Sequence, residues 1–245
     1  MEIIINNLSK EFKDGYSRHR GILNRLISLI IDGKKQKSLL ALKNINLEIN
    51  QGEKIGLIGK NGSGKSTLLR IIARMYQKDS GKIKINNPPV YIGNLHGLMK
   101  LRLTMKDNIN LLCSLLGLDN QKIKEKLPSI IKFSELEEYS DAQLYKFSSG
   151  MTIRLLFSIF IHSIDTSKNS ILLLDELLSD ALDKEFKIKS TEKIKEVMKS
   201  EATIILISHN INLIKNFCDK TILMENGAIK DYGPTNKILK KYLNN

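Results

Sequence analysis

A glycine-rich run that ends in lysine and serine gives the chain its strongest chemical signal. Residues 59–67 read Gly-Lys-Asn-Gly-Ser-Gly-Lys-Ser-Thr and fit the pattern G-x-x-x-x-G-K-[ST] completely. Such glycines let the backbone curl so that successive N–H groups face a β-phosphate, while Lys65 reaches the β- and γ-oxygens and Ser66 binds Mg²⁺. We therefore predict a nucleotide site, whose phosphate-binding loop consists of Gly59, Lys60, Asn61, Gly62, Ser63, Gly64, Lys65, Ser66 and Thr67.

Two acidic residues follow an apolar run much later in the chain. Ile171–Leu174 is apolar throughout and leads directly into Asp175 and Glu176. A carboxylate at the end of a buried strand is where phosphate-loop proteins hold Mg²⁺ through its bound water, so Asp175 is the predicted metal residue together with Ser66. Glu176 is placed to orient or deprotonate the water that attacks the γ-phosphate. Two solvated acids at a strand end are the alternative.

A histidine stands in the same relation to a second apolar run. Thr203–Ile207 leads into Ser208 and His209. An imidazole at that strand end can form a hydrogen bond with the γ-phosphate. A surface or core histidine is the alternative, but the position after a second buried strand favours the functional role. The predicted catalytic residues are therefore Glu176, His209 and Lys65.

The elements that must position these residues follow a mixed α/β pattern. Strands are predicted over 2–8, 39–49, 54–58, 81–85, 89–92, 171–174 and 203–207, helices over 66–75, 152–161, 183–199 and 211–218, and a hairpin over 221–230. Between about Thr104 and His162 apolar residues recur at helical spacing. No internal repeat or low-complexity linker divides the chain, so residues 1–245 are predicted to form one domain with a helical insert at about 95–165.

The composition is that of a folded protein, with 42% hydrophobic and 27% charged residues. The net charge of +13 favours an anionic neighbour, such as a nucleotide, a nucleic acid or a membrane surface, and does not choose among them. Cys113 and Cys218 are predicted to be reduced core thiols. Residues 1–7 lack the basic start of a signal peptide, and no apolar run approaches the roughly 20 residues that a membrane span needs. We therefore expect a cytoplasmic chain with, at most, a peripheral membrane role.

In their order along the chain these motifs resemble the ATP-binding cassette (ABC) family. The phosphate-binding loop, a helical insert, the Asp175-Glu176 strand end and the Ser208-His209 strand end together span nearly the whole sequence. The family's signature motif, usually LSGGQ, resembles Phe147-Ser148-Ser149-Gly150-Met151. The resemblance implies an α/β fold with a RecA-like mixed sheet, an N-terminal antiparallel β-subdomain and a helical insert.

The same resemblance implies how the site is completed and what it binds. Its ligands would be ATP and Mg²⁺, and two copies of the cassette would pair head to tail. The signature residues Ser148, Ser149, Gly150 and Met151 of one copy would then contact the ATP held by the other copy's phosphate-binding loop. Donors at a helix start are suited to a γ-phosphate.

Three further family positions are matched less closely. The aromatic residue that contacts adenine is best matched by Phe12, with Tyr16 as the alternative. The glutamine of the family's Q-loop is expected around residues 94–96, where Asn94 or His96 would have to replace it. Residues 177–183 resemble the D-loop, with Asp183 as its acid, but they lack the usual Pro-Thr and are one residue longer.

Two features favour the cassettes that export bacterial surface polysaccharides. The signature form Phe-Ser-Ser-Gly-Met followed by Arg154-Leu155 resembles that of O-antigen, capsule and teichoic acid exporters. An insertion at about 13–41 carries apolar residues at i, i+1, i+4, i+5 and i+8 with basic residues at both ends, which suits a helix at a membrane interface. It resembles the gate helix of O-antigen exporters, and a helix packed on its own domain is the alternative.

The predicted function is therefore an ATP-hydrolysing subunit that powers export of a lipid-linked surface polysaccharide such as O-antigen. It would act at the cytoplasmic face of the inner (plasma) membrane as a homodimer on a separate transmembrane permease. The glycan would be contacted through that permease and through the 13–41 insertion. Transport of a lipid, drug or peptide is the second hypothesis. A soluble ABC ATPase that acts on nucleic acid or ribosomes is the third, and we expect no nucleic-acid partner.

Overall fold

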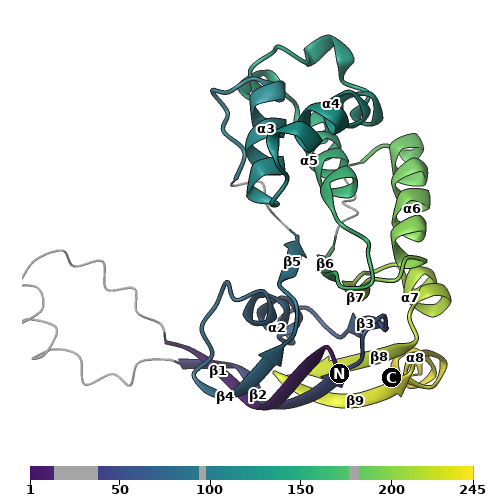
Figure 1. The fold of residues 1–245 in the computed structure, drawn as a ribbon. Coiled ribbons are helices and arrows are strands. Elements are labelled where there is room, and N and C mark those ends of the chain that lie inside the picture. Colours follow the sequence, from purple (N-terminus) through teal and green to yellow (C-terminus); the bar gives the residue numbers. More distant parts are fainter. Residues whose placement is uncertain (14–37, 94–97, 177–181, 245) are drawn as a thin grey trace, which may run out of the picture.

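The chain folds into two lobes, one built on β-sheets and one built of helices (Figure 1). The computed structural model describes residues 1–13, 38–93, 98–176 and 182–244. Within these ranges no helix has the length and apolar content that crossing a membrane requires.

The centre of the β lobe is a six-stranded sheet in the order β5-β6-β7-β3-β8-β9. Its strands are β3 (Lys54–Ile58), β5 (Pro89–Ile92), β6 (Ile171–Asp175), β7 (Thr203–Ile207), β8 (Lys220–Glu225) and β9 (Ala228–Pro234). Neighbouring strands are parallel except β8 and β9, which form an antiparallel hairpin. The hairpin turns at Asn226 and Gly227, which both have positive φ, as this two-residue turn requires.

Both faces of this sheet are buried, which explains why its strands read as continuous apolar runs. Alternate residues of β6 and β7 enter different cores because successive side chains of a strand point to opposite faces. One core contains Leu172, Leu174, Ile204 and Leu206, and the other contains Ile171, Leu173, Ile205 and Ile207.

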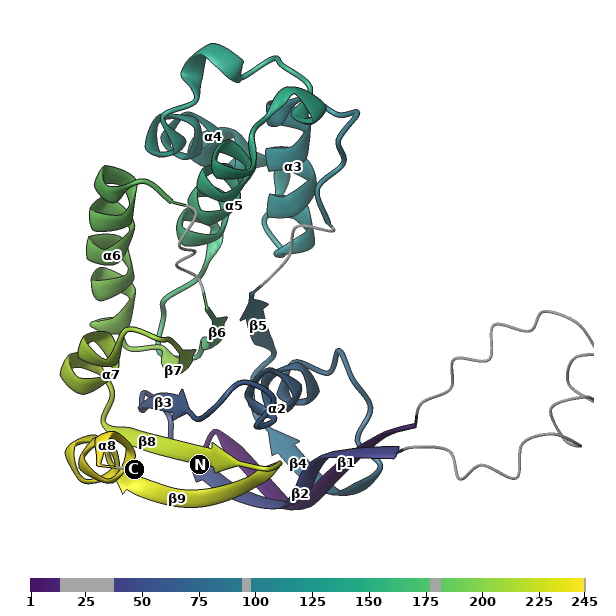
Figure 2. The same ribbon diagram turned by 180° about the vertical axis from the view of Figure 1, so that it is seen from behind.

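A second, antiparallel sheet of three strands, in the order β2-β1-β4, lies beside the hairpin of β8 and β9 (Figure 2). Its strands are β1 (Ile3–Lys13), β2 (Ser38–Ile49) and β4 (Ser80–Ile85). The helix α2 (Lys65–Ile72) contributes Leu68, Leu69, Ile71 and Ile72 to the core that it shares with both sheets. The phosphate-binding loop connects β3 to α2. The packing of α2 therefore fixes this loop at the end of a central strand.

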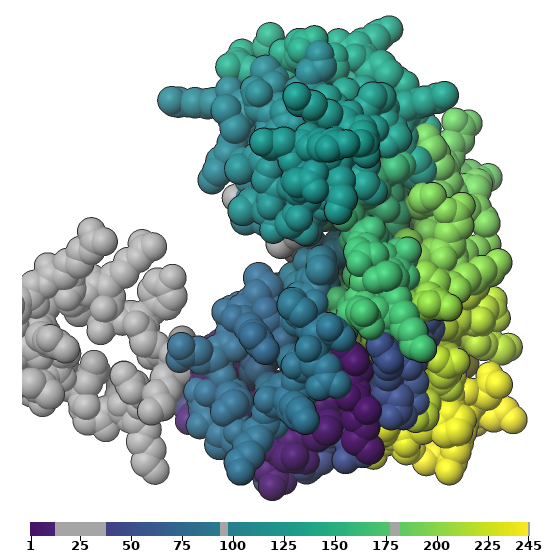
Figure 3. All heavy atoms as spheres, viewed as in Figure 1, coloured from purple at the N-terminus to yellow at the C-terminus, as the bar shows by residue number. Residues whose placement is uncertain are grey.

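The helical lobe consists of α3 (Met105–Leu115), α4 (Asn120–Ser134) and α5 (Ser149–Ser163), with the 3-10 turns η2 (Glu137–Tyr139) and η3 (Leu144–Lys146). The first two helices begin at side-chain caps: Thr104 caps α3 in a reciprocal capping box with Asp107, and Asp119 caps α4. The helix α6 (Lys184–Met198) stands along both lobes, and α7 (Ile211–Phe217) follows β7. Figure 3 shows the helical lobe overhanging the β lobe.

Most elements predicted from the sequence are confirmed, and so is the α/β fold with an antiparallel subdomain. One predicted helix start was wrong, and one helix was not predicted. The signature helix begins at Ser149 and not at residue 152, because the Ser148 hydroxyl caps it by accepting from the Met151 N–H. The helix α8 (Thr235–Leu243) was not predicted, although Ile238, Leu239, Tyr242 and Leu243 recur at helical spacing and Ile238 and Leu239 are buried.

Candidate nucleotide site

The phosphate-binding loop needs glycine at two positions for steric reasons. Gly59 and Gly64 have φ values of 143° and 102°, which side chains rarely adopt. A Cβ atom at Gly59 would also lie 2.2 Å from the Met224 carbonyl oxygen, and one at Gly64 would lie 2.7 Å from that of Ala41. The sequence therefore needs glycine here to let the loop approach β8 and β2.

The start of α2 is free to receive an anion from outside the chain. Gly64 is its N-cap residue and supplies no side-chain hydrogen bond. The first N–H groups of a helix lack partners within it and carry the positive end of the helix dipole. This uncapped start, at the end of a glycine loop, fits a phosphate group.

The hairpin turn between β8 and β9 contacts the phosphate-binding loop. Sequence reasoning missed this contact. The Gly227 N–H donates to the Ser63 carbonyl oxygen at 3.1 Å, and the Lys43 N–H donates to the Gly227 carbonyl oxygen at 2.8 Å. A Cβ atom at Gly227 would lie 2.7 Å from the Ala41 carbonyl oxygen, so glycine is needed here as well. The β8–β9 hairpin and β2, which are far apart in the sequence, therefore hold the loop in one shape.

Lys65 lies in the mouth of the loop and is buried. Its ammonium group donates to the carbonyl oxygens of Gly59 at 2.8 Å and Lys60 at 3.1 Å. Burial lowers the pKa of Lys65, and the nearby carboxylates of Glu176 and Asp175 oppose this shift. The charge is thus held where a phosphate could replace the carbonyl groups as its partner.

Ser66 and Asp175 meet as the sequence predicts. The Ser66 hydroxyl donates to Asp175 Oδ1 at 3.2 Å, and the Tyr91 hydroxyl donates to Asp175 Oδ2 at 2.7 Å. Hydroxyl and carboxylate oxygens are the ligands that Mg²⁺ prefers, and it is usually bound through one or two such groups plus substrate phosphates. The Ser66 hydroxyl on α2 and the Asp175 carboxylate at the end of β6 therefore fit Mg²⁺ bound beside a nucleotide.

Glu176 and His209 also lie together, at the ends of neighbouring strands β6 and β7. His209 Nε2 is 3.0 Å from Glu176 Oε1, and both side chains are exposed. Glu176 has a φ of 52°, a left-handed conformation that is uncommon outside glycine, and its N–H donates to the Ile207 carbonyl oxygen at 3.1 Å. Strain of this kind clusters at functional sites. The backbone thus holds Glu176 beside Asp175 with its side chain free to meet a ligand.

Two cavities border the loop within the described part of the chain. The larger, of about 390 Å³, is lined by residues 59–63, the hairpin and Tyr242 of α8. The smaller, of about 140 Å³, is lined by Gly59, Lys65, His209 and again Tyr242. Tyr242 is a site-bordering residue that sequence reasoning missed, because α8 was not predicted.

Phe12 lines neither of these cavities. It lies at the end of β1, where its ring packs edge-on against Tyr76 with 5.7 Å between ring centroids. Tyr16, the alternative, lies outside the described residues, and so do Asn94 and His96. The adenine contact and the Q-loop replacement therefore stay predictions.

The signature residues lie at the start of α5. Ser148 is the N-cap, while Ser149, Gly150 and Met151 form the first turn. Figures 1 and 2 show α5 in the helical lobe and α2 in the β lobe, so the chain's own phosphate-binding loop is on a different lobe.

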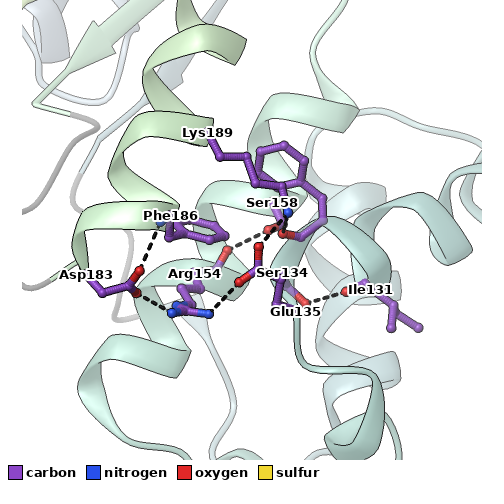
Figure 4. Close-up of polar contacts among 9 residues, drawn as sticks. Ile131, Ser134, Glu135, Arg154, Ser158, Asp183, Phe186 and Lys189 are labelled. Atoms are coloured by element: carbon purple, nitrogen blue, oxygen red, sulfur yellow. Dashed lines mark hydrogen bonds and ion pairs between the residues drawn. The ribbon is translucent and has the colours of Figure 1, made fainter.

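Asp183, the predicted D-loop acid, has two partners within the chain (Figure 4). It caps α6 by accepting from the Phe186 N–H at 2.9 Å, and it forms an ion pair with Arg154 of α5. Arg154 also pairs with Glu135 at 2.9 Å, and its guanidinium lies 5.1 Å from the centre of the Phe186 ring. Residues 177–181, the rest of the predicted D-loop, lie outside the described residues.

We expect Arg154→Ala to destabilise the fold by about 1–2 kcal/mol, since it removes two partly exposed ion pairs and one cation–π contact. Thermal unfolding would measure the effect. The matched control is Lys195→Ala, which breaks one exposed ion pair with Glu192 on α6 and should change stability by less than about 0.5 kcal/mol. Equal effects of the two variants would show that the Arg154 contacts add nothing beyond one surface pair.

Comparison with known proteins gives the class of this cassette. The chain matches the ABC transporter family over residues 42–179, more than half of its length. It therefore belongs to the ABC transporter family.

Three curated relatives share one name, teichoic acids export ATP-binding protein TagH. The protein from Lactococcus lactis subsp. lactis (strain IL1403) is 39% identical over 220 residues, which are 89% of this chain and 46% of that protein. The protein from Shouchella clausii (strain KSM-K16) is 35% identical over 98% of this chain and 65% of its own length. The protein from Staphylococcus haemolyticus (strain JCSC1435) is 36% identical over 99% of this chain and 88% of its own length. The chain thus spans less than two thirds of the first two relatives.

Solved structures confirm the fold. The ATP-binding cassette MJ0796, in a dimeric post-hydrolysis state bound to ADP and Pi, has a TM-score of 0.71 and 20% identity over 95% of this chain and 98% of that chain. An ATP-binding subunit of an ABC transporter has a TM-score of 0.72 and 22% identity over 99% of this chain and 93% of that chain.

Proposed function

We propose that the chain hydrolyses ATP to power export of a teichoic acid or a similar lipid-linked surface polymer. The observation that carries the proposal is the similarity, over nearly the whole chain, to relatives named for teichoic acid export. The site supports the hydrolytic part, because a phosphate-binding loop, two metal-ligand oxygens and a carboxylate–imidazole pair lie at one edge of the sheet.

In this proposal each residue of the site has one task. Amides of the phosphate-binding loop and Lys65 hold the β- and γ-phosphates. The Glu176 carboxylate accepts a proton from water as the water oxygen attacks the γ-phosphorus and the bond to the bridging oxygen breaks, which leaves ADP and phosphate. His209 donates a hydrogen bond to the γ-phosphate. Bound Mg²⁺, held by Ser66 and Asp175, would neutralise charge on the phosphate oxygens.

A second copy of the chain would complete this site. The N-cap and first turn of α5 carry hydroxyl and amide donors on a lobe that does not hold the chain's own phosphate-binding loop. Two copies paired head to tail would bring Ser148, Ser149, Gly150 and Met151 of each copy to the ATP of the other. Solved relatives of this fold include dimeric cassettes. ATP binding would then close the pair, and hydrolysis would open it.

A transmembrane permease would receive this motion. Leu101 and Leu103, just before α3, and Tyr145 in η3 form an exposed apolar patch on the helical lobe. Backbone hydrogen bonds join its two segments, from the Tyr145 N–H to the Leu101 carbonyl oxygen at 2.9 Å and from the Leu144 N–H to the Leu103 carbonyl oxygen at 3.1 Å. Exposed apolar groups gathered in this way mark interaction surfaces. We assign the patch to the permease contact, and in this proposal the cassette acts at the cytoplasmic face of the plasma membrane.

The insertion at 13–41 is the second proposed contact with the transport pathway. Its central residues, 14–37, lie outside the described residues, so the proposal rests on their basic and apolar pattern alone. The names of the relatives favour teichoic acid as the cargo over the O-antigen that the sequence pattern first suggested.

Charge in the apolar patch should uncouple hydrolysis from export. We expect Leu101→Glu with Tyr145→Glu to keep the ATPase rate of the purified chain and to lower teichoic acid on the surface of the native host as far as depletion of the chain does. Surface polymer would be measured as cell-wall phosphate. The control is Leu115→Glu, because Leu115 is 63% exposed on α3 outside the patch. Cell-wall phosphate that stays normal after depletion of the chain would contradict the proposed cargo. Cell-wall phosphate that falls after depletion but stays normal in the patch variant would contradict the assignment of the patch.

A further inference from the structure

Asp175 has a second partner that the motifs do not explain. Tyr91 of β5 donates its hydroxyl hydrogen to Asp175 Oδ2 at 2.7 Å, while Oδ1 accepts from Ser66 at 3.2 Å. The two carboxylate oxygens therefore have different environments. One is held by a phenol that comes from the neighbouring strand, and the other faces the hydroxyl that would share the metal.

The neighbouring glycine makes room for this contact. A Cβ atom at Gly93 would lie 2.5 Å from the Tyr91 hydroxyl oxygen and 2.7 Å from the ring carbon that bears it. The φ of Gly93 is not in the left-handed region, so its backbone does not require glycine. The requirement is steric, since a larger residue at 93 would push the Tyr91 ring away from Asp175.

Arg70 of α2 sets the direction of the phenol hydrogen bond. Its Nε–H points to the Tyr91 hydroxyl oxygen at 3.4 Å, and a guanidinium can only donate. The Tyr91 oxygen thus faces a donor on one side and must give its own hydrogen to Asp175 on the other.

We propose that Tyr91 is a positioning residue for the metal site, which acts by fixing the Asp175 carboxylate so that Oδ1 stays available beside Ser66. The inference rests on the proposed role of Asp175 in holding Mg²⁺. A carboxylate that is held by one oxygen loses its freedom to rotate and offers the other oxygen in a fixed direction. Partners of this kind typically change metal affinity or activity 10- to 100-fold when they are removed.

The test measures Mg²⁺ and not turnover. Binding of a fluorescent ATP analogue, MANT-ATP, would be titrated with EDTA present and at increasing Mg²⁺ for the wild type, Tyr91→Phe and Gly93→Ala. Without Mg²⁺ we expect both variants to bind MANT-ATP with wild-type affinity, which also shows that they are folded. With Mg²⁺, the concentration at which the change in MANT-ATP binding is half complete should be about tenfold higher in Tyr91→Phe than in the wild type. Gly93→Ala should act in the same direction, although it keeps the phenol.

Two controls separate this inference from the proposal on which it rests. Tyr76→Phe removes a hydroxyl that contacts Arg70 but not Asp175, so its Mg²⁺ dependence should match that of the wild type. Asp175→Asn should abolish most of the Mg²⁺ dependence. A wild-type response in Asp175→Asn would overturn both the metal site and the role of Tyr91. A loss in Asp175→Asn with an unchanged or stronger Mg²⁺ response in Tyr91→Phe would overturn the role of Tyr91 alone.

Discussion

Glu176→Gln should lower the rate of ATP hydrolysis by about 10²–10⁴-fold while ATP binding persists, because an amide cannot accept the proton of the attacking water. The substitution keeps the size of the side chain and leaves the Glu176 backbone bond to Ile207 in place. Since the closed pair opens only after hydrolysis in the proposed cycle, the variant should also accumulate as an ATP-bound dimer. Phosphate release and molecular mass in solution would measure the two effects.

The control for this variant is Glu185→Gln, which changes an exposed acid in the first turn of α6. It should hydrolyse ATP at the wild-type rate and have the same oligomeric state in solution as the wild type. Near-normal hydrolysis by Glu176→Gln would mean that another group takes the proton. A low rate without a trapped dimer would support the base but contradict the proposed opening step.

Lys65→Ala should weaken nucleotide binding itself by at least about 100-fold. Lys65 is buried, and its ammonium group already makes two hydrogen bonds to the loop that a phosphate could replace. Bonds that involve a charged group contribute about 1.5–3 kcal/mol each, and 1.4 kcal/mol corresponds to tenfold in affinity. Equilibrium binding of MANT-ATP would measure the loss.

Removal of a positive charge elsewhere should not have this effect. Lys124→Ala, on an exposed face of α4, has the same change in net charge and should bind the nucleotide as the wild type does. Unchanged affinity in Lys65→Ala would contradict the assignment of residues 59–67 as the phosphate-binding loop. An equal loss in both variants would point to the overall charge of +13 instead of the site.

The parts of the fold that the sequence predicts well are those whose signal is local. The strands β3, β6 and β7 are buried over their full length and are mostly apolar because both faces of the sheet are covered. The Asn226-Gly227 pair marks a tight hairpin. The phosphate-loop motif predicted Ser66, and the ends of two apolar runs predicted Asp175, Glu176 and His209 as residues around one nucleotide. The structure brings Ser66 to Asp175 and Glu176 to His209.

Two of the missed contacts join residues far apart in the sequence. Tyr91 reaches Asp175 over 84 positions, and no spacing rule links a tyrosine on one strand to an acid on another. The ion pair of Arg154 with Asp183 depends on how α5 packs near α6, which periodicity cannot give. Tyr242 was missed because its short helix was not predicted, although Ile238, Leu239, Tyr242 and Leu243 have helical spacing.

The most direct test of the central claim is the location of surface polymer in native-host cells that express Glu176→Gln. The account predicts that lipid-linked teichoic acid accumulates on the cytoplasmic face of the membrane while cell-wall phosphate falls. The polymer would be located by its protection from externally added hydrolase in intact cells. Normal wall phosphate, in cells where the variant has replaced the wild-type chain, would contradict the claim that this cassette powers export of that polymer.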